Sequence, residues 1–411
     1  MALTKLTTNL ISGDIVTSVN GASGAVTVST GTDWVTAIQT ANFTSVASKG
    51  YFVNTTSAEV TVTLPVGAVG DEIVIQDYAG TFAANRIILA ANGSEKIQGS
   101  ANDFQCNTNN ATLTLIYQDA TKGWTSDNIV INLLPLTVDY LVVAGGGSGP
   151  GTHGGGGGAG GLRTSFGSNS GGGSSAETTL TLQVLTNYTA TIGAGGSAPG
   201  AGGNNGNSGS SSVFHTITSI GGGWGEYYST SGGTGGSGGG SSYGHPGGLG
   251  TANQGYAGGA GLAAYQNGTG GGGASQAGNA NASNAGGNGG DGLAVSITGS
   301  SVYYAGGGGG GLNGSGTLGS GGTGGGGSAT TGVGQSGTAN TGGGGAGGHY
   351  SPHQSGGSGG SGVIILRYPS DYTISPLSGS GGFTYTTDTS ISNTKVTTFT
   401  AAGGGNMQFT I

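Results

Sequence analysis

The sequence predicts a protein that is mostly β-structure plus irregular chain, and three observations carry that prediction. Glycine accounts for 101 of the 411 residues, and 84 of these glycines lie between Val138 and Tyr368. Short apolar runs frame and interrupt this glycine-rich segment. Outside it, Thr and Val recur with period two, as is typical of strands. We therefore expect N-terminal β modules, a central polyglycine II helix bundle framed by short strands, and a C-terminal β-hairpin, in the four domains 1–50, 51–137, 138–368 and 369–411.

The first domain, residues 1–50, begins with a polar lead and continues into an alternating stretch at 17–28. The dipeptide Asn20-Gly21 favours a tight turn ahead of a strand. Further on, Thr32 or Asp33 is suited to cap a helix, so we predict a short helix over residues 33–41.

Residues 51–137 are predicted to form a β module. Thr- and Val-rich runs alternate with turns that contain Asn, Asp and Gly, a pattern that fits a β-sandwich or a barrel. Pro135, at the junction with the glycine-rich segment, argues against a helix there. The predicted strands lie at 60–65, 71–76, 86–90 and 111–117.

The glycine domain, residues 138–368, requires a specific explanation, because a glycine tract is by default a flexible linker. A solvated linker has no need of the apolar runs found here, which we predict to be strands. These runs are 139–144, 179–192, 212–220, 292–304 and 362–368.

Between these strands, glycine can satisfy its backbone in polyglycine II helices. Such helices have three residues per turn, and their N–H and C=O groups point outward to neighbouring helices. A helix at the centre of the bundle then consists of unbroken glycine, as at 306–311, whereas one at the surface carries a side chain at every third residue, as at 235–239 and 356–362. Collagen is disfavoured, because no Gly-X-Y period is sustained and the chain has only 8 prolines.

The last domain, residues 369–411, returns to Thr-rich alternation. Its three alternating stretches, at 382–387, 395–400 and 406–411, predict a β-hairpin or an added pair of strands.

Composition and charge exclude several classes of partner. Charged residues make up 6% of the chain, the formal net charge is −8, and Lys and Arg together number 8. The chain therefore lacks the basic surface that nucleic acid or anionic lipid attracts. Cys106 is alone, so no intrachain disulfide is expected. The N-terminus has no continuous apolar segment of the kind found in signal peptides, and we predict no membrane insertion.

Aromatic residues and histidines gather in the intervals between glycine runs. Tyr and Trp provide contact area at low entropic cost, and Ser, Gly and Asn provide adaptable hydrogen bonds, as in antibody loops. These side chains suit sugar rings or the loops of an outer-membrane protein; alternatively, they pack along the sides of the bundle and supply the apolar burial that glycine lacks. The candidate binding residues are Trp224, Tyr227, Tyr228, Tyr243, His245, Tyr265, His349, Tyr350 and His353.

Catalytic and cofactor motifs do not fit this sequence. A Gly-x-Gly-x-x-Gly match at 149–154 is followed by more glycine instead of the helix that holds a pyrophosphate. His349 and His353 are separated by Pro352, so they do not share a helical face as zinc-binding histidines do, although a loop could still bring them to one metal. Glycan hydrolysis needs two carboxylates at catalytic separation, and the glycine domain offers only Glu177, Glu226 and Asp291. Glu226 lies beside Trp224 and Tyr227, a setting that suits a sugar, but no general-acid motif surrounds it. We predict no enzymatic activity, no cofactor and no metal.

The order of blocks in the glycine domain resembles that of glycine-rich domains in tailed-bacteriophage tail fibres and adhesins. The residues that carry this resemblance are those at 140–147, 154–163, 189–196 and 359–368, and segments 18–27 and 51–132 are similar to the attachment element and the small β modules of such fibres. In that family, polyglycine helices form a rigid platform and the loops at its far end contact the host. The Phe-Thr stretch near 383 departs from the pattern, because its counterpart in the family precedes the glycine domain.

The resemblance implies a function and a location. Residues 1–50 would attach to other virion tail proteins, 51–137 would be a fibre module of a homotrimer, and 138–368 would recognise a bacterial surface receptor, either a glycan or an outer-membrane protein. The protein would be made in the host cytoplasm and reside in the virion. Two alternatives are a structural or decoration (spike) protein without a receptor role, and an ice-binding polyglycine bundle, which needs a flat face that these bulky aromatics interrupt.

Overall fold

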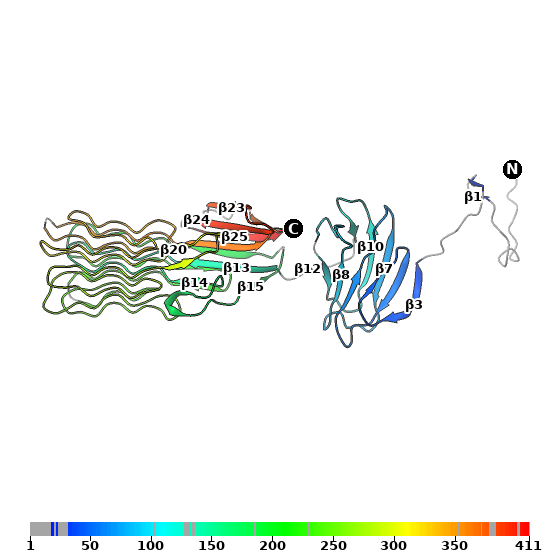
Figure 1. Cartoon of the computed structure of the whole chain (residues 1–411), viewed down its shortest axis with the longest axis horizontal. Coiled ribbons are helices and arrows are strands. Elements are labelled where there is room, and N and C mark those ends of the chain that lie inside the picture. Colours follow the sequence, from blue (N-terminus) through cyan, green and yellow to red (C-terminus); the bar gives the residue numbers. More distant parts are fainter. Residues whose placement is uncertain are drawn as a thin grey trace. The chain divides into compact units, whose positions relative to one another are not determined.

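The computed structural model describes residues 32–126, 136–377, 384–400 and 403–410, apart from 102, 185, 229, 352 and 371, together with the strand positions 18–19, 22–23 and 132–133. It divides into two compact units, residues 1–132 and 133–411, which we describe separately (Figure 1). Among these residues the only helical element is a short 3-10 turn, η1 (Gly171–Gly173). No helix in the described part is long and apolar enough to cross a membrane.

The first unit contains two five-stranded sheets. One has the order β11 (Trp124–Thr125), β10 (Thr112–Tyr117), β7 (Glu72–Asp77), β5 (Lys49–Val53) and β3 (Asp33–Gln39). The other has the order β12 (Asn132–Leu133), β9 (Phe104–Cys106), β8 (Ile87–Ala90), β6 (Val60–Thr63) and β4 (Phe43–Thr44). Two separate sheets agree with the sandwich expected from the sequence and not with the barrel.

Most successive strands of the first unit alternate between these two sheets. From β3 to β8 each strand lies in the opposite sheet to the one before it, and β3, β5 and β7 are parallel, as are β4, β6 and β8. The later strands β9, β10 and β11 pair antiparallel. Alternating side chains place one face of each strand in the core between the sheets. In β6, Val60 and Val62 are fully buried, whereas Thr61 and Thr63 are partly exposed. The ring of Phe43 contacts that of Tyr51 between the two sheets, at a centroid distance of 4.9 Å.

The helix predicted over residues 33–41 is wrong, because this segment forms β3. It pairs in parallel with β5, and the ring of Trp34 stacks on that of Phe52 at a centroid distance of 4.5 Å. The Asp33 carboxylate, expected to cap a helix, forms an ion pair with Lys49. Pairing with a distant strand therefore overrides the local capping signal. The turn predicted at Asn20-Gly21 lies outside the described residues, although β1 (Ser18–Val19) pairs antiparallel with β2 (Ala22–Ser23).

The second unit also contains two large sheets. The first has the order β14 (Leu162–Thr164), β13 (Leu136–Val143), β21 (Val363–Pro369), β24 (Thr394–Thr400) and β23 (Thr384–Asp388), and β15 (Leu180–Leu182) pairs with the start of β13. The second has the order β18 (Ile217–Ser219), β17 (Ser212–Phe214), β16 (Tyr188–Ile192), β25 (Gly403–Thr410) and β22 (Thr373–Pro376). A separate pair is formed by β19 (Leu293–Val295) and β20 (Val302–Tyr304). Every apolar run predicted as a strand in the glycine domain contains at least one.

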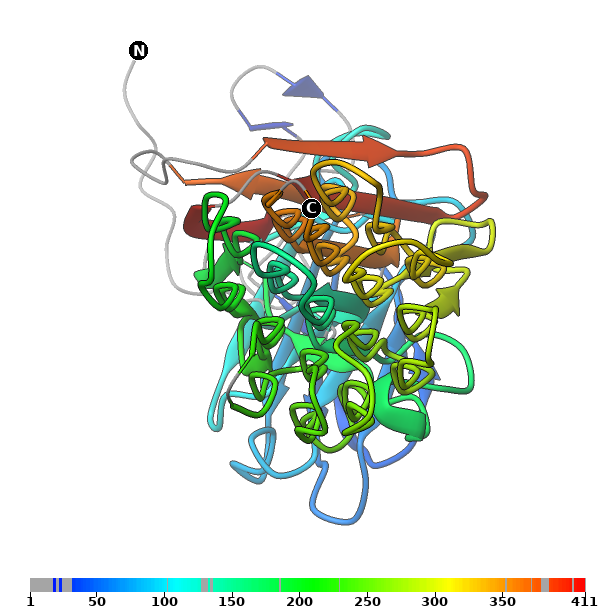
Figure 2. The same ribbon diagram turned by 90° about the vertical axis from the view of Figure 1, so that its left-hand side faces the viewer.

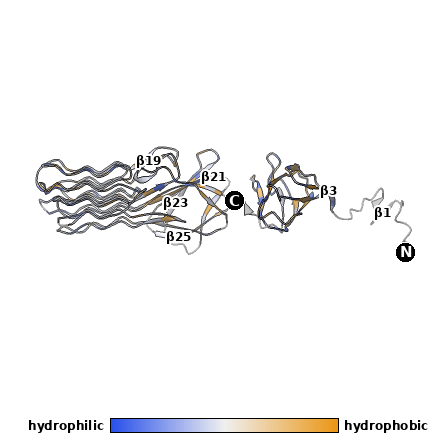
Figure 3. Cartoon of the chain, turned by 90° about the horizontal axis from the view of Figure 1, so that it is seen from below, coloured by the Kyte–Doolittle hydropathy of each residue, from blue (hydrophilic) through white to orange (hydrophobic). Residues whose placement is uncertain are grey.

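Side chains of both sheets form one core, which includes Tyr140, Phe214, Leu366, Phe399 and Phe409. Strands β22, β24 and β25 supply part of it, so residues beyond 369 belong to the same unit as the glycine domain. Hydrophobic residues concentrate in the strands, whereas the glycine-rich coils carry few (Figure 3). Apolar burial therefore stabilises the sheets, whereas the coils depend on backbone hydrogen bonds to one another.

Beyond the sheets, the glycine-rich chain runs back and forth in side-by-side coils with a triangular outline when viewed end-on (Figure 2). Their backbone hydrogen bonds repeat every three residues. In the segment 155–161, N–H groups three residues apart donate to the same neighbour: 220–226 for the first set, 269–272 for the second and 342–345 for the third, at 2.8–3.0 Å. Each coil in the interior thus satisfies its backbone through several neighbours at once.

Close approach of these coils excludes side chains. A Cβ on Gly157 would overlap the carbonyl oxygen of Gly147, and one on Gly308 would overlap that of Gly345. The runs 154–158 and 306–311 are entirely buried. In the segment 356–362, by contrast, the side chains at every third position are partly exposed, as the sequence predicts.

The surface position predicted for residues 235–239 is wrong. Ser237 is fully buried, and successive N–H groups from Gly236 to Gly238 donate to three different segments. The serine fits in the interior because its hydroxyl occupies the space that a Cβ on Gly255 would fill. A side chain at every third position is therefore not by itself a sign of the surface, because a facing glycine leaves room for Ser237 in the interior.

Candidate functional site: the turns of the glycine domain

The glycine-rich coils reverse direction at an end of the second unit opposite its sheets (Figure 1). Hydrogen bonds connect neighbouring turns: the Thr152 amide donates to the Gln354 carbonyl at 2.8 Å, and the Tyr350 amide donates to the Leu312 carbonyl at 3.1 Å. Asn267 continues this connection, because its side chain accepts from the Asn313 amide at 3.0 Å. Turns that are far apart in the sequence thus form one continuous surface.

Six rings from four of these turns form an aromatic cluster around His153. The centroid of the imidazole lies 5.0 Å from Tyr350, 5.6 Å from Tyr227 and 5.7 Å from Tyr243. Tyr228 extends the cluster from Tyr243, at 4.5 Å, and His353 extends it from Tyr350, at 4.7 Å. The aromatic cluster is hereafter His153, Tyr227, Tyr228, Tyr243, Tyr350 and His353.

His153 is the centre of the cluster and is absent from the sequence-based candidates. Its side chain is 3% exposed, and within the described residues neither ring nitrogen has a hydrogen-bond partner. Burial lowers the pKa of His153 to about 4, helped by the nearby charge of His353. The only sequence signal for this residue is that a bulky side chain interrupts the glycine runs at 145–158.

Two residues of these turns have left-handed backbone conformations that glycine usually supplies. Thr152 has φ of 56° and Tyr243 has φ of 50°. Such conformations are unfavourable for β-branched and bulky residues and gather at functional sites. Gly203 is required for another reason: a Cβ there would lie 2.6 Å from the ring of Tyr227. The backbone is thus shaped to bring the rings together.

The buried side chain of Glu226 connects two of the turns by hydrogen bonds. Its carboxylate is fully buried and accepts hydrogen bonds from the Thr230 amide at 3.1 Å and from the amide and hydroxyl of Ser242, both at 3.0 Å. Burial raises the pKa of Glu226, and these hydrogen bonds partly oppose that shift. These three hydrogen bonds hold together the turns that carry Tyr227, Tyr228 and Tyr243.

His349 also has a structural position. Its Nε2 lies 2.9 Å from the Gly314 carbonyl oxygen, and its Nδ1 lies 3.1 Å from the carbonyl oxygen and 3.2 Å from the amide nitrogen of Ser351. Since both ring nitrogens are engaged, His349 joins its own turn to the one at Gly314. Among the described residues, no group of three or more His, Cys, Asp or Glu side chains is placed to bind a metal ion.

The remaining sequence candidates lie outside the aromatic cluster. Trp224 is on a straight coil, where its ring packs on Gly233, and its Nε1 has no hydrogen-bond partner among the described residues. His245 is partly buried in the turn after Tyr243, and its carbonyl accepts from the Ser241 hydroxyl at 2.6 Å. Tyr265 is partly buried in another turn, and its carbonyl oxygen accepts a hydrogen bond from the Asn281 side chain at 3.3 Å. The structure thus brings together five of the nine predicted residues and adds His153.

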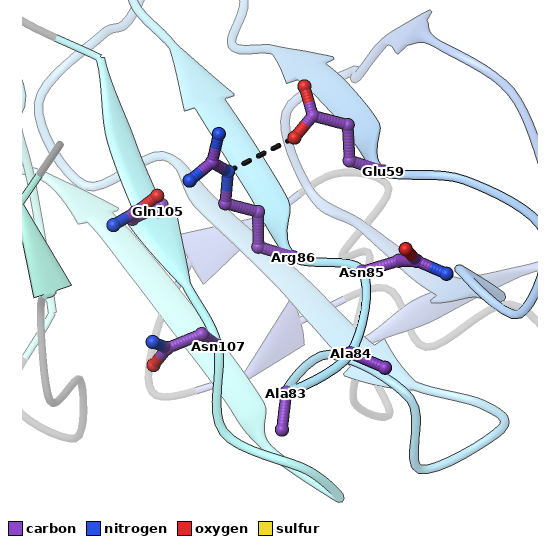
Figure 4. Close-up of a pocket in the computed structure, with 7 residues that line it drawn as sticks. All are labelled: Glu59, Ala83, Ala84, Asn85, Arg86, Gln105 and Asn107. Atoms are coloured by element: carbon purple, nitrogen blue, oxygen red, sulfur yellow. Dashed lines mark hydrogen bonds and ion pairs between the residues drawn. The ribbon is translucent and has the colours of Figure 1, made fainter. Parts of the chain in front are cut away.

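The first unit has a polar pocket of about 260 Å³, lined by side chains of β9 and of the chain before β6 and β8 (Figure 4). Arg86 Nε donates to Glu59 at 3.0 Å across it, and Gln105 and Asn107 line the opposite wall. Both members of this ion pair are well exposed, with side-chain exposures of 39% and 50%. Such a pair contributes little binding energy. The aromatic cluster is therefore the stronger candidate site.

Comparison with known families identifies most of the second unit as a glycine-rich domain. A family model described as a glycine-rich domain matches residues 121–369, which is more than half of the chain. The chain therefore belongs to this glycine-rich domain family. A search of curated proteins finds no match.

Proposed function

We propose that this protein is a tail-fibre or adhesin protein of a tailed bacteriophage, and that its aromatic cluster binds a receptor on the bacterial surface. The observation that supports the proposal is the convergence of rings from turns as far apart in sequence as residues 153 and 353 at the end opposite the sheets. Half-exposed tyrosines on a fixed backbone provide contact area with little loss of entropy on binding.

The glycine-rich coils are, in this proposal, polyglycine II helices that act as a rigid support. The three-residue period of the hydrogen bonds and the overlap that any Cβ would cause favour this conformation. Because each interior coil is hydrogen-bonded to several neighbours, the turns are held in place in the free protein. Such preorganisation lowers the entropic cost of binding a receptor.

The proposed virion attachment and oligomeric state follow from the resemblance of the sequence to phage fibres. Residues 1–50 attach the protein to other tail proteins of the virion, and the protein assembles as a homotrimer. Several copies on one virion then bind the cell together, so weak single contacts give strong attachment.

Adsorption of the labelled full-length protein to a panel of bacterial strains tests this function. The full chain is used because β24 and β25 complete both sheets of the second unit. The test variant is Tyr228→Ala combined with Tyr350→Ala, whose side chains are 51% and 40% exposed. The matched control is Tyr303→Ala combined with Tyr385→Ala, 50% and 39% exposed on the strands β20 and β23.

We expect a strain that binds the wild-type and control proteins and not the test variant. Equal binding by all three proteins would refute the receptor role of the aromatic cluster. Binding to no strain, together with normal infectivity of virions whose protein lacks the cluster side chains, would indicate a structural or decoration protein. Thermal hysteresis of the solution would indicate an ice-binding bundle.

A further inference from the structure

The chemistry of the turns restricts the kind of receptor that the aromatic cluster accepts. The sequence of every turn at this end lacks Asp, Glu, Lys and Arg; these turns are 150–153, 200–205, 227–231, 243–246, 262–267, 282–285, 312–317, 330–333 and 349–354. The nearest carboxylate described above, Glu226, is fully buried and accepts three hydrogen bonds. These turns therefore offer no carboxylate, ammonium or guanidinium group with which to select a phosphate, an acidic sugar or a charged peptide.

The area of the aromatic cluster is small. Tyr228 is 51% exposed, Tyr350 is 40% exposed and His353 is exposed, whereas the other rings lie deeper. Three exposed or partly exposed rings present on the order of 300 Å², so the rings by themselves do not reach the roughly 800 Å² per partner that a stable protein interface buries. This area is suited to one or two sugar rings.

The polar groups next to the rings complete such a site. Thr230 and Ser351 are exposed, and Gln354 is partly exposed beside Thr152. Asn205 is held in place because its side chain accepts from the Tyr227 amide at 2.9 Å. Hydroxyl and amide groups at the edge of aromatic faces are the donors and acceptors that a neutral sugar requires.

From these observations, and building on the receptor role proposed above, we infer that the aromatic cluster binds an uncharged sugar. The sugar stacks on Tyr228 or Tyr350, and its hydroxyl groups bind the neighbouring polar side chains. His153 packs against three of the tyrosine rings, and as a buried imidazole without hydrogen-bond partners among the described residues it is uncharged at neutral pH.

Ligand-observed NMR on the full-length protein tests the inference. The probes are D-glucose, D-galactose and N-acetyl-D-glucosamine, with D-glucuronate as the charged comparison. We expect at least one neutral probe to bind with a dissociation constant of about 1 mM and to lose roughly tenfold in affinity with Tyr228→Ala or Tyr350→Ala. The remote variants Tyr303→Ala and Tyr385→Ala retain full affinity. Raising NaCl from about 20 mM to about 500 mM leaves neutral-sugar binding unchanged, because no charged contact is screened.

The inference is overturned if no neutral probe binds at roughly 100 mM, far above the millimolar range, if only D-glucuronate binds, or if the remote variants lose as much affinity as the cluster variants. Competition on cells separates this result from the proposed function. Cell binding that needs Tyr228 and Tyr350 but resists saturating neutral sugar rejects the sugar and keeps the receptor role. Cell binding that does not need these tyrosines rejects both.

Discussion

One carboxylate oxygen of Glu226, Oε2, accepts both the amide and the hydroxyl hydrogen of Ser242, each at 3.0 Å. The two residues belong to different coils, and the bonds hold together the turns that carry Tyr228 and Tyr243. A buried carboxylate thus has a structural role here: it supplies acceptors to backbone donors that the turns leave unpaired.

Removing this carboxylate is expected to destabilise the second unit. Glu226→Ala leaves the amides of Thr230 and Ser242 without their acceptor, so the free energy of unfolding falls by about 3 kcal/mol. Denaturation of the full chain by guanidinium measures the change. Asp291→Ala is the control, because the Asp291 carboxylate accepts its hydrogen bonds from the amide and hydroxyl of the exposed Thr323, both at 2.8 Å, and its loss costs about 1 kcal/mol. Similar losses for both variants would contradict the role of Glu226.

His153 makes stability depend on pH. Its pKa is lowered from 6.5 to about 4 in the folded protein. The unfolded chain therefore takes up a proton at a higher pH than the folded chain does, so the free energy of unfolding decreases as pH falls from about 6.5 to about 4 and is unaffected by His153 above that window. The decrease is on the order of 3 kcal/mol.

His153→Gln isolates this contribution, because glutamine does not titrate. Unfolding of both proteins is followed by denaturant titration at pH values between 7 and 4. The difference between wild type and variant should shift steadily in favour of the variant as pH falls. A difference that does not change with pH would show that the pKa of His153 is the same in the folded and unfolded protein, which would contradict the lowered pKa.

Glycines in the interior of the coils should tolerate no side chain. Gly308→Ala places a methyl group on the Gly345 carbonyl, which lowers the free energy of unfolding by about 3 kcal/mol. Gly200 is the matched control, since no atom lies within 4 Å of a Cβ there. Gly200→Ala should be neutral or stabilise by less than about 1 kcal/mol. Thermal denaturation and amide exchange of the two variants distinguish them, and equal melting temperatures would argue against close-packed coils.

Cys106 reports on the first unit alone. The thiol is buried, and burial raises its pKa, with a smaller contribution from the charge of Asp77. We expect the folded protein to react with a disulfide reagent at least about a thousandfold more slowly than the unfolded chain. The thiol should therefore become reactive when the first unit unfolds, and Cys106→Ala provides the blank. Rapid labelling under native conditions would mean that β9 opens easily.

Local signals in the sequence predict the strands of the glycine domain well and the aromatic site only partly. The apolar run at 139–144 ends at a glycine run, and it forms most of β13, which pairs with β14 and β15 on one side and with β21 on the other. Tyr227, Tyr228, Tyr243, Tyr350 and His353 are recognisable because bulky rings interrupt glycine runs. Nothing in the spacing of Trp224 or Tyr265 separates them from these five, since only the lateral order of the coils decides which turns are neighbours.

By itself, the sequence determined the chemistry of this protein: a glycine content that only backbone bonding between close coils can use, strands where β-branched residues alternate, and turns without charge. The tertiary structure decided three further matters. It made residues 33–39 a strand by pairing them with β5, it buried Ser237 against Gly255, and it placed His153 within a ring of tyrosines. The physical reason is common to all three, because each depends on contacts between residues distant in the chain, and local propensity contains no information about such contacts.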